Sequence, residues 1–273
     1  MHSWIDGQAA TALNLQNRGL AYGDGLFETI AVRAGRPSLL TQHLDRLALG
    51  CQRLAIEADL PLIRDEIIAY ASQLGEGVAK LILTRGDSLR GYAPAAGAAP
   101  RRILQGSPLP AYPRENAEHG IRLFDCQTRL AEQPLLAGLK HLNRLEQVLA
   151  RSEWQGTDHA EGLMRDMQGR LIEGVYSNLF LVRDGVLLTA DLSRCGVAGV
   201  MRAALLEQAA ALGVQTQVRD LALAELEQAD EVFLCNSVYG LWPVREFAAL
   251  KLNWPPGPLT RKLQAVARTL LET

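Results

Sequence analysis

Lys140 is the residue whose type and surroundings point most directly to covalent chemistry. It follows an apolar run over 134–139 and precedes a helix-like pattern with leucines at 142, 145 and 149. An ammonium group beside apolar side chains is partly dehydrated, and dehydration lowers the pKa of a lysine. Schiff-base formation requires the neutral amine that results. The simpler interpretation is a surface lysine at the start of a helix, and this spacing alone favours it.

The sequence motif around Lys140 adds a second line of argument. Residues 140–149 read Lys-His-Leu-Asn-Arg-Leu-Glu-Gln-Val-Leu and resemble the Schiff-base segment of the fold-type IV pyridoxal-phosphate enzymes. That family contains the lyases of 4-amino-4-deoxychorismate, which are the best match, and the D-amino-acid and branched-chain aminotransferases. The resemblance implies pyridoxal 5'-phosphate as the cofactor and Lys140 as the lysine that holds it.

A glycine-rich stretch over 17–29 leads into a predicted hairpin. The hairpin has strands over 26–32 and 37–40, joined by a turn at Ala34-Gly35. The motif Tyr-Gly-Asp-Gly-Leu-Phe-Glu-Thr resembles the N-terminal motif of the same family. The resemblance implies that the Thr29 hydroxyl faces the substrate, at a position where the D-amino-acid aminotransferases usually carry an apolar residue. Without the resemblance, Thr29 is an ordinary strand threonine.

An amphipathic helix is predicted over 40–54, with Thr41 as its N-cap. Its motif His-Leu-Asp-Arg-Leu resembles the family segment in which an arginine, here Arg46, binds the cofactor phosphate. A planar guanidinium matches phosphate oxygens well. The alternative is an Arg46 paired with a neighbouring carboxylate on the helix surface. A second helix is predicted over 60–74 and a buried strand over 78–84.

The polar loop over 85–92 contains Arg90-Gly91-Tyr92. This triplet resembles the lyase loop that reaches toward the substrate, so Arg90 and Tyr92 are candidate substrate-binding residues. The implied substrate has two carboxylates, and an arginine suits them. A solvated loop arginine is the alternative.

The second half of the chain carries the remaining cofactor residues that the resemblance implies. Glu173 matches the glutamate that accepts a hydrogen bond from the pyridine nitrogen, which keeps the ring an electron sink. The glycines over 196–199 precede a predicted helix, whose first N–H groups can hold an anion. The other candidates for cofactor binding are Ser177 and Asn178, the backbone N–H groups of Val200 and Met201, and Ser237.

Length and composition bound the remaining possibilities. The chain has 273 residues and a formal net charge of −2, which predicts about two domains and no nucleic-acid or membrane partner. The four cysteines lie far apart without metal spacing, which favours a reduced cytoplasm. The histidines do not cluster, so no metal site is expected. The proline-rich stretch near 108–113 predicts a linker over 108–115 between domains 1–107 and 116–273.

The implied fold is therefore two α/β domains with the cofactor in the cleft between them, in a homodimer. The implied reaction converts 4-amino-4-deoxychorismate into 4-aminobenzoate and pyruvate, a step toward folate. A D-amino-acid aminotransferase on the same scaffold is the alternative; Thr29 and the Arg90 loop favour the lyase. A branched-chain aminotransferase fits less well, because its pattern has a tyrosine where this chain has Leu145. A non-catalytic protein that retains the fold would leave Lys140 without cofactor.

Overall fold

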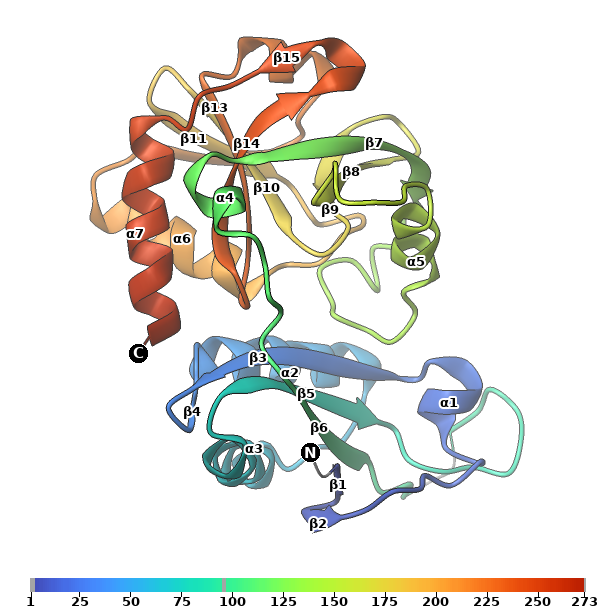
Figure 1. Cartoon of the computed structure of the whole chain (residues 1–273). Helices are drawn as coiled ribbons and strands as arrows, with labels where there is room; N and C mark the ends of the chain where they lie inside the picture. The colour runs from blue at the N-terminus through green and yellow to red at the C-terminus, as the bar shows by residue number, and fades with distance from the viewer. Residues whose placement is uncertain (1–2, 95–96, 273) are drawn as a thin grey trace. The chain divides into compact units, whose positions relative to one another are not determined.

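The computed structural model describes residues 3–94 and 97–272 (Figure 1). The described chain forms two compact units. Unit 1 holds the chain up to Pro110, the segment Leu139–Asn143 and the end of the chain from Leu271; unit 2 holds Ala111–Gly138 and Arg144–Leu270. The first crossing, at Pro110, lies inside the stretch predicted as a linker. The segment that carries Lys140 groups with unit 1, although the sequence-based division counts it with the second domain.

Unit 1 is one sheet with two long helices. Its strands lie in the order β2-β1-β6-β5-β3-β4. The elements are β1 (Trp4–Ile5), β2 (Gln8–Ala9), α1 (Arg18–Tyr22), β3 (Gly25–Arg33), β4 (Arg36–Pro37), α2 (Leu40–Leu54), α3 (Leu60–Leu74), β5 (Gly77–Thr84) and β6 (Arg101–Ser107).

The core of unit 1 lies between this sheet and the two helices. Leu26 and Ile30 of β3 share one face of the strand and pack with Leu47 of α2 and Ile67 of α3. Successive strand residues point to opposite faces, so Phe27 and Thr29 lie on the other face. Burying an aliphatic side chain of this size stabilises the fold by roughly 1.5–3 kcal/mol.

Unit 2 is built on a larger sheet whose path runs β12-β11-β10-β13-β14-β7-β8-β9. Its elements are α4 (Arg114–Glu118), β7 (Ile121–Leu130), α5 (Leu145–Arg151), β8 (Glu161–Asp166), β9 (Leu171–Gly174), β10 (Asn178–Arg183), β11 (Val186–Ala190), α6 (Val200–Ala211), β12 (Thr216–Arg219), β13 (Glu231–Asn236), β14 (Gly240–Phe247), β15 (Leu252–Asn253) and α7 (Pro258–Glu272).

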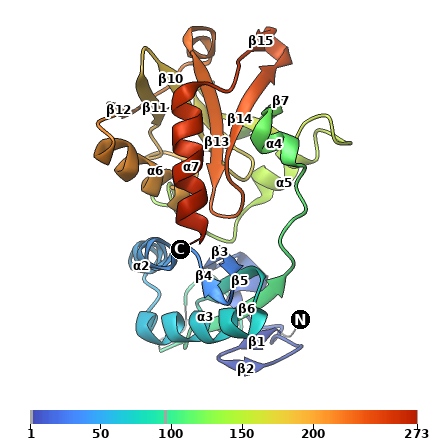
Figure 2. The same ribbon diagram turned by 60° about the vertical axis from the view of Figure 1, so that its left-hand side comes forward.

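An additional pairing closes part of this sheet on itself. Glu173 of β9 pairs with Asn178 of β10, so the strands from β10 through β13, β14, β7 and β8 to β9 form a ring. Closure removes exposed sheet edges. Figure 2 shows α6 and α7 in front of this sheet. Within the described residues, no helix is both long and apolar enough to cross a membrane.

The structure confirms the predicted helix over 60–74 and the buried strand over 78–84, and it corrects other local predictions. The returning hairpin strand is limited to Arg36–Pro37, because the chain turns into α2 after Leu39, which has a left-handed backbone. Thr41 lies inside α2 and is not its N-cap; Leu39 occupies that position without a side-chain cap. The helix after Lys140 begins only at Leu145, and α1 was not expected.

Candidate active site

Lys140 is held on the edge of β3. The Phe27 N–H donates to the Lys140 carbonyl at 2.9 Å, and the Leu142 N–H donates to the Gly25 carbonyl at 3.0 Å. Lys140 and its neighbours thus act as a short added strand, which is why the helix starts later than the leucine spacing predicts. The preceding run is not uniformly dehydrated: Leu139 is buried, whereas Leu135 is exposed. Lys140 is half-buried, with Nζ 4.3 Å from the centre of the Phe27 ring.

Three consecutive residues of β3 connect the predicted site residues of unit 1. Phe27 contacts Lys140, Glu28 binds Arg46 on the helix face of the sheet, and Thr29 is half-buried on the face of Phe27. Thr29 lies opposite Lys80 of β5. The structure therefore gathers Lys140, Thr29 and Arg46 around one short piece of strand. The roles that the sequence assigns to them remain predictions.

Arg46 forms a buried network with Glu28 and His43. The Arg46 Nε donates to Glu28 Oε1 at 2.8 Å, a second Arg46 nitrogen binds Oε2, and His43 Nδ1 donates to the same carboxylate. Burial alone would raise the pKa of Glu28, but the charge of Arg46 and the hydrogen bonds from His43 and Arg46 lower that pKa to about 2. Burial lowers the pKa of His43. The carboxylate partner of Arg46 is thus a buried strand residue and not one on the helix surface.

In unit 2, the peptide groups around Val197 connect Glu173 with Asn178. The Val197 N–H donates to Glu173 Oε2 at 2.8 Å, and Asn178 Nδ2 donates to the Val197 carbonyl at 2.9 Å. The other Glu173 oxygen lies 3.5 Å from Nε2 of Gln147. Glu173 and Asn178 are buried and pair directly across β9 and β10. The predicted ring-nitrogen partner is therefore a fixed, buried carboxylate.

The start of α6 fits the phosphate of the implied cofactor. Gly199 precedes the helix, and no side chain of a described residue caps it, so the N–H groups of Val200 and Met201 remain suited to an anion. A Cβ at Gly199 would lie 2.0 Å from Asn178 Oδ1, so only glycine allows this close packing. Within unit 2, buried Glu173 and the start of α6 match the needs of pyridoxal phosphate for a proton partner and an anion cradle.

Ser177 lies in the turn between β9 and β10, where it contacts a residue that sequence reasoning missed. Its hydroxyl donates to Glu161 Oε2 at 2.7 Å. Glu161, at the start of β8, also accepts the N–H groups of Gly162, Val175 and Tyr176. Burial raises the pKa of Glu161 to about 7, against the lowering effect of these four hydrogen bonds. Glu161 therefore fixes the turn that carries Ser177.

Ser237 follows β13 in the tight turn toward β14. Asn236 shapes this turn by accepting the N–H groups of Val238 and Tyr239 on Oδ1, both at 2.9 Å. Its Nδ2 donates to the Tyr176 carbonyl at 3.3 Å, next to Ser177. The two serines predicted for cofactor binding thus lie on turns that contact each other.

Arg90 and Tyr92 lie on the exposed loop between β5 and β6. Arg90 makes no side-chain hydrogen bond or ion pair with any residue in 3–94 or 97–272, and Tyr92 is 86% exposed. The Tyr92 ring lies 5.5 Å from the ring of Tyr22. Both candidate substrate residues are available for contact from outside unit 1.

Glu28, His43 and Glu161 were not assigned roles from the sequence. Glu28 carried a usable signal: it alternates with Leu26 and Ile30 and must share their buried face. A charge on a buried face needs a partner. Glu161 carried no such signal, because three of its four partners are backbone N–H groups, and backbone groups are present at almost every position.

Comparison with known proteins gives four further findings. Residues 25–247 match the family described as amino-transferase class IV. A crystal structure of 4-amino-4-deoxychorismate lyase from Pseudomonas aeruginosa is 62% identical, with a TM-score of 0.96 over 99% of this chain and 100% of that one. The aminodeoxychorismate lyase of Vibrio harveyi is 37% identical over 97% of this chain and 99% of its own length. The D-alanine aminotransferase of Bacillus licheniformis is more distant, at 26% identity over 93% of this chain and 89% of its own length.

Proposed function

The chain belongs to the class IV aminotransferase family, and from this membership we propose that it converts 4-amino-4-deoxychorismate into 4-aminobenzoate and pyruvate with pyridoxal phosphate as cofactor. The observation that carries the proposal is the 62% identity to a lyase over almost the whole chain, against 26% to a D-alanine aminotransferase. The presence of Thr29, where the D-amino-acid aminotransferases usually have an apolar residue, supports the same choice.

The residues of this chain divide the work of such a reaction. Pyridoxal phosphate, when bound, supplies a ring that withdraws electrons from the substrate carbon that carries nitrogen. Lys140 would hold the cofactor and, once released, take the proton from that carbon. Glu173 would bind the ring nitrogen, and Arg46, Ser177, Asn178, Ser237 and the N–H groups of Val200 and Met201 would bind the cofactor around it. Arg90 and Tyr92 would bind the substrate, with Arg90 on a carboxylate.

The elimination itself needs little more from the protein. Once the proton is removed, the enolpyruvyl oxygen would leave with the bonding electrons from the adjacent ring carbon, and the six-membered ring would become aromatic. Aromatisation makes this step downhill, so positioning is the main contribution of the protein. Lys140 or Thr29 would protonate the leaving group, because Thr29 lies on β3 and Lys140 contacts Phe27 of the same strand.

We also propose that the protein is a cytoplasmic homodimer. The four cysteines are buried and unpaired, and burial raises the pKa of Cys51 to about 11 and of Cys126 to about 12, so they stay thiols. On α5, Leu145, Val148 and Leu149 form an exposed apolar stripe, which a second copy could cover. Sedimentation velocity should give twice the chain mass, and Leu149→Asp should reduce the dimer fraction.

The deciding experiment follows both products together. Cofactor-loaded protein incubated with enzymatically generated 4-amino-4-deoxychorismate should release equimolar 4-aminobenzoate and pyruvate, faster than the reaction without protein. Lys140→Ala should abolish turnover, and borohydride should no longer fix the cofactor to the chain, which mass spectrometry would read. Transamination of D-alanine with 2-oxoglutarate, without either product, would instead establish the aminotransferase.

A further inference from the structure

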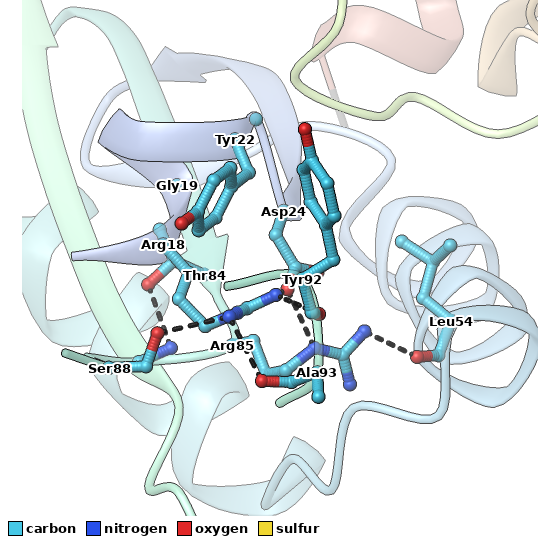
Figure 3. A network of polar contacts seen from close by, with 12 residues as sticks. Arg18, Gly19, Tyr22, Asp24, Leu54, Thr84, Arg85, Ser88, Tyr92 and Ala93 are labelled. Carbon is cyan, nitrogen blue, oxygen red and sulfur yellow. Dashed lines mark hydrogen bonds and ion pairs between the residues drawn. The ribbon is translucent and has the colours of Figure 1, made fainter. Parts of the chain in front are cut away.

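The guanidinium of Arg18 is buried beneath the loop over 88–93. Its side chain is 4% exposed, although Arg18 opens the short helix α1. It donates to the Ser88 hydroxyl at 3.0 Å, to the Gly91 carbonyl at 3.0 Å and to the Tyr92 carbonyl at 2.8 Å, with a longer contact of 3.5 Å to the Ala93 carbonyl. Figure 3 shows this side chain reaching from α1 into the loop. One buried cation thus binds several successive residues of the loop.

The opposite edge of the guanidinium is anchored to the rest of unit 1. Arg18 Nε donates to Asp24 Oδ2 at 2.8 Å, and Arg85 Nε donates to the same oxygen at 2.8 Å. Arg85 also donates to the carbonyls of Leu54 and Ala55 at the end of α2. Burial alone would raise the pKa of Asp24, but hydrogen bonds from Arg85 and Arg18 lower it, so the carboxylate stays ionised. Arg18 therefore joins the loop to a fixed frame.

Further contacts restrain the loop from the same side. The Gly91 N–H donates to the Tyr22 hydroxyl at 3.1 Å, and Arg18 Cζ lies 5.0 Å from the centre of the Tyr22 ring. Backbone hydrogen bonds thus hold Ser88 and Gly91 on either side of Arg90, while the Arg90 side chain makes no hydrogen bond or ion pair with a described residue. Hydrogen bonds from a charged donor are about twice as strong as neutral ones, so Arg18 dominates this restraint.

We propose that Arg18 is a positioning residue that holds the loop over 88–93 in the conformation that presents Arg90 and Tyr92 to the dicarboxylate substrate; this rests on the proposed function. Arg18 and Arg85 share one carboxylate, so the cluster keeps a positive charge beneath the loop. That charge also favours a substrate with two carboxylates. Holding the loop in advance lowers the entropy lost when substrate binds.

The test compares Arg18→Lys with Arg90→Gln and with the double variant, all loaded with cofactor. Lysine keeps the charge but has only three donors, so it cannot bind Asp24, the Ser88 hydroxyl and both carbonyls at once. Arg18→Lys should raise KM about tenfold with kcat nearly unchanged. The loss in the double variant should be smaller than the sum of the two single losses in free energy, because Arg18 acts in part through Arg90. Arg102→Lys is the matched control, because Arg102 binds Glu66 away from the loop. The KM of this variant should equal that of the unmodified protein.

Hydrogen exchange of the loop amides gives a readout that needs no substrate. Exchange over 88–93 should be faster in Arg18→Lys, and slightly faster in Ser88→Ala, which removes one acceptor and spares the fold. Unchanged exchange in both variants would overturn the proposal. So would additive effects on KM in the double variant, or a parallel loss of kcat, cofactor affinity and thermal stability in Arg18→Lys. If the unmodified protein formed no 4-aminobenzoate, the proposed function would fail, and the exchange result would still decide whether Arg18 holds the loop.

Discussion

Two buried glutamates, one in each unit, support the predicted cofactor residues in opposite ways. Glu28 in unit 1 binds the charged Arg46 and the neighbouring His43. Glu161 in unit 2 accepts hydrogen bonds from the Ser177 hydroxyl and from three backbone N–H groups, which are all neutral. Both side chains are almost completely removed from water. The pKa of Glu28 is nevertheless lowered to about 2, while that of Glu161 is raised to about 7.

The difference shows that the charge of the partners decides whether a buried carboxyl ionises. Burial acts against the charged form in both places. At Glu28, a guanidinium offsets this cost, and the carboxylate in return fixes the orientation of Arg46. At Glu161, neutral donors offset only part of the cost of burying the charged carboxylate. The titratable groups that interact with Glu161 are those of Tyr112, Cys126, Tyr176 and Tyr239, and none of them adds a positive charge.

Glu28→Gln should give the largest effect. The amide keeps the size of the side chain but leaves Arg46 buried without its counter-charge, and breaking a buried ion pair in this way costs about 3–5 kcal/mol. Cofactor affinity should fall as well, because Arg46 loses its fixed orientation. Urea denaturation followed by circular dichroism and titration with pyridoxal phosphate would measure the two effects.

A surface ion pair provides the control for this variant. Glu76 lies 3.7 Å from Arg33 and is largely exposed, so Glu76→Gln should change stability by less than about 1 kcal/mol. Equal losses in Glu28→Gln and Glu76→Gln would mean that the buried network contributes no more than a surface pair. The contrast between the two units would then have no energetic basis.

The same contrast marks what the sequence could predict. Lys140, Glu173 and the glycines before α6 could be assigned roles from the sequence because they belong to contiguous motifs with a chemical meaning, and these roles remain predictions. The long helices over 40–54 and 60–74 were found because their apolar spacing is regular. The start of α5 was missed, because hydrogen bonds between Lys140–Leu142 and β3 override the local leucine pattern. Glu161 and Arg18 were missed because many of their partners are backbone groups, and a backbone partner leaves no mark in the sequence.

Glu161→Gln should destabilise the protein less than Glu28→Gln, by about 1–3 kcal/mol. The amide oxygen can keep the N–H groups of Gly162 and Val175, but its NH₂ group would face the Tyr176 N–H, which is also a donor. Ser177→Ala removes one of the four hydrogen bonds and keeps the carboxyl group, so it should cost less, about 1 kcal/mol. A larger loss in Ser177→Ala than in Glu161→Gln would place the main interaction at the hydroxyl.

The pH dependence of these losses gives the smallest and sharpest test. Because the pKa of Glu161 is raised from 4.5 to about 7, its contribution is full below pH 4.5 and is lost as the pH rises through about 7. Because the pKa of Glu28 is lowered from 4.5 to about 2, its contribution is full above pH 4.5 and is lost as the pH falls toward 2. The loss of unfolding free energy caused by Glu161→Gln should therefore decrease as the pH rises from 4.5 to 8. The loss caused by Glu28→Gln should stay constant over that range and decrease as the pH falls below 4.5. Urea denaturation of the unmodified protein, Glu161→Gln and Glu28→Gln from pH 3 to 8 would measure both trends. Parallel trends would show that neutral and charged partners act alike on the two carboxyl groups.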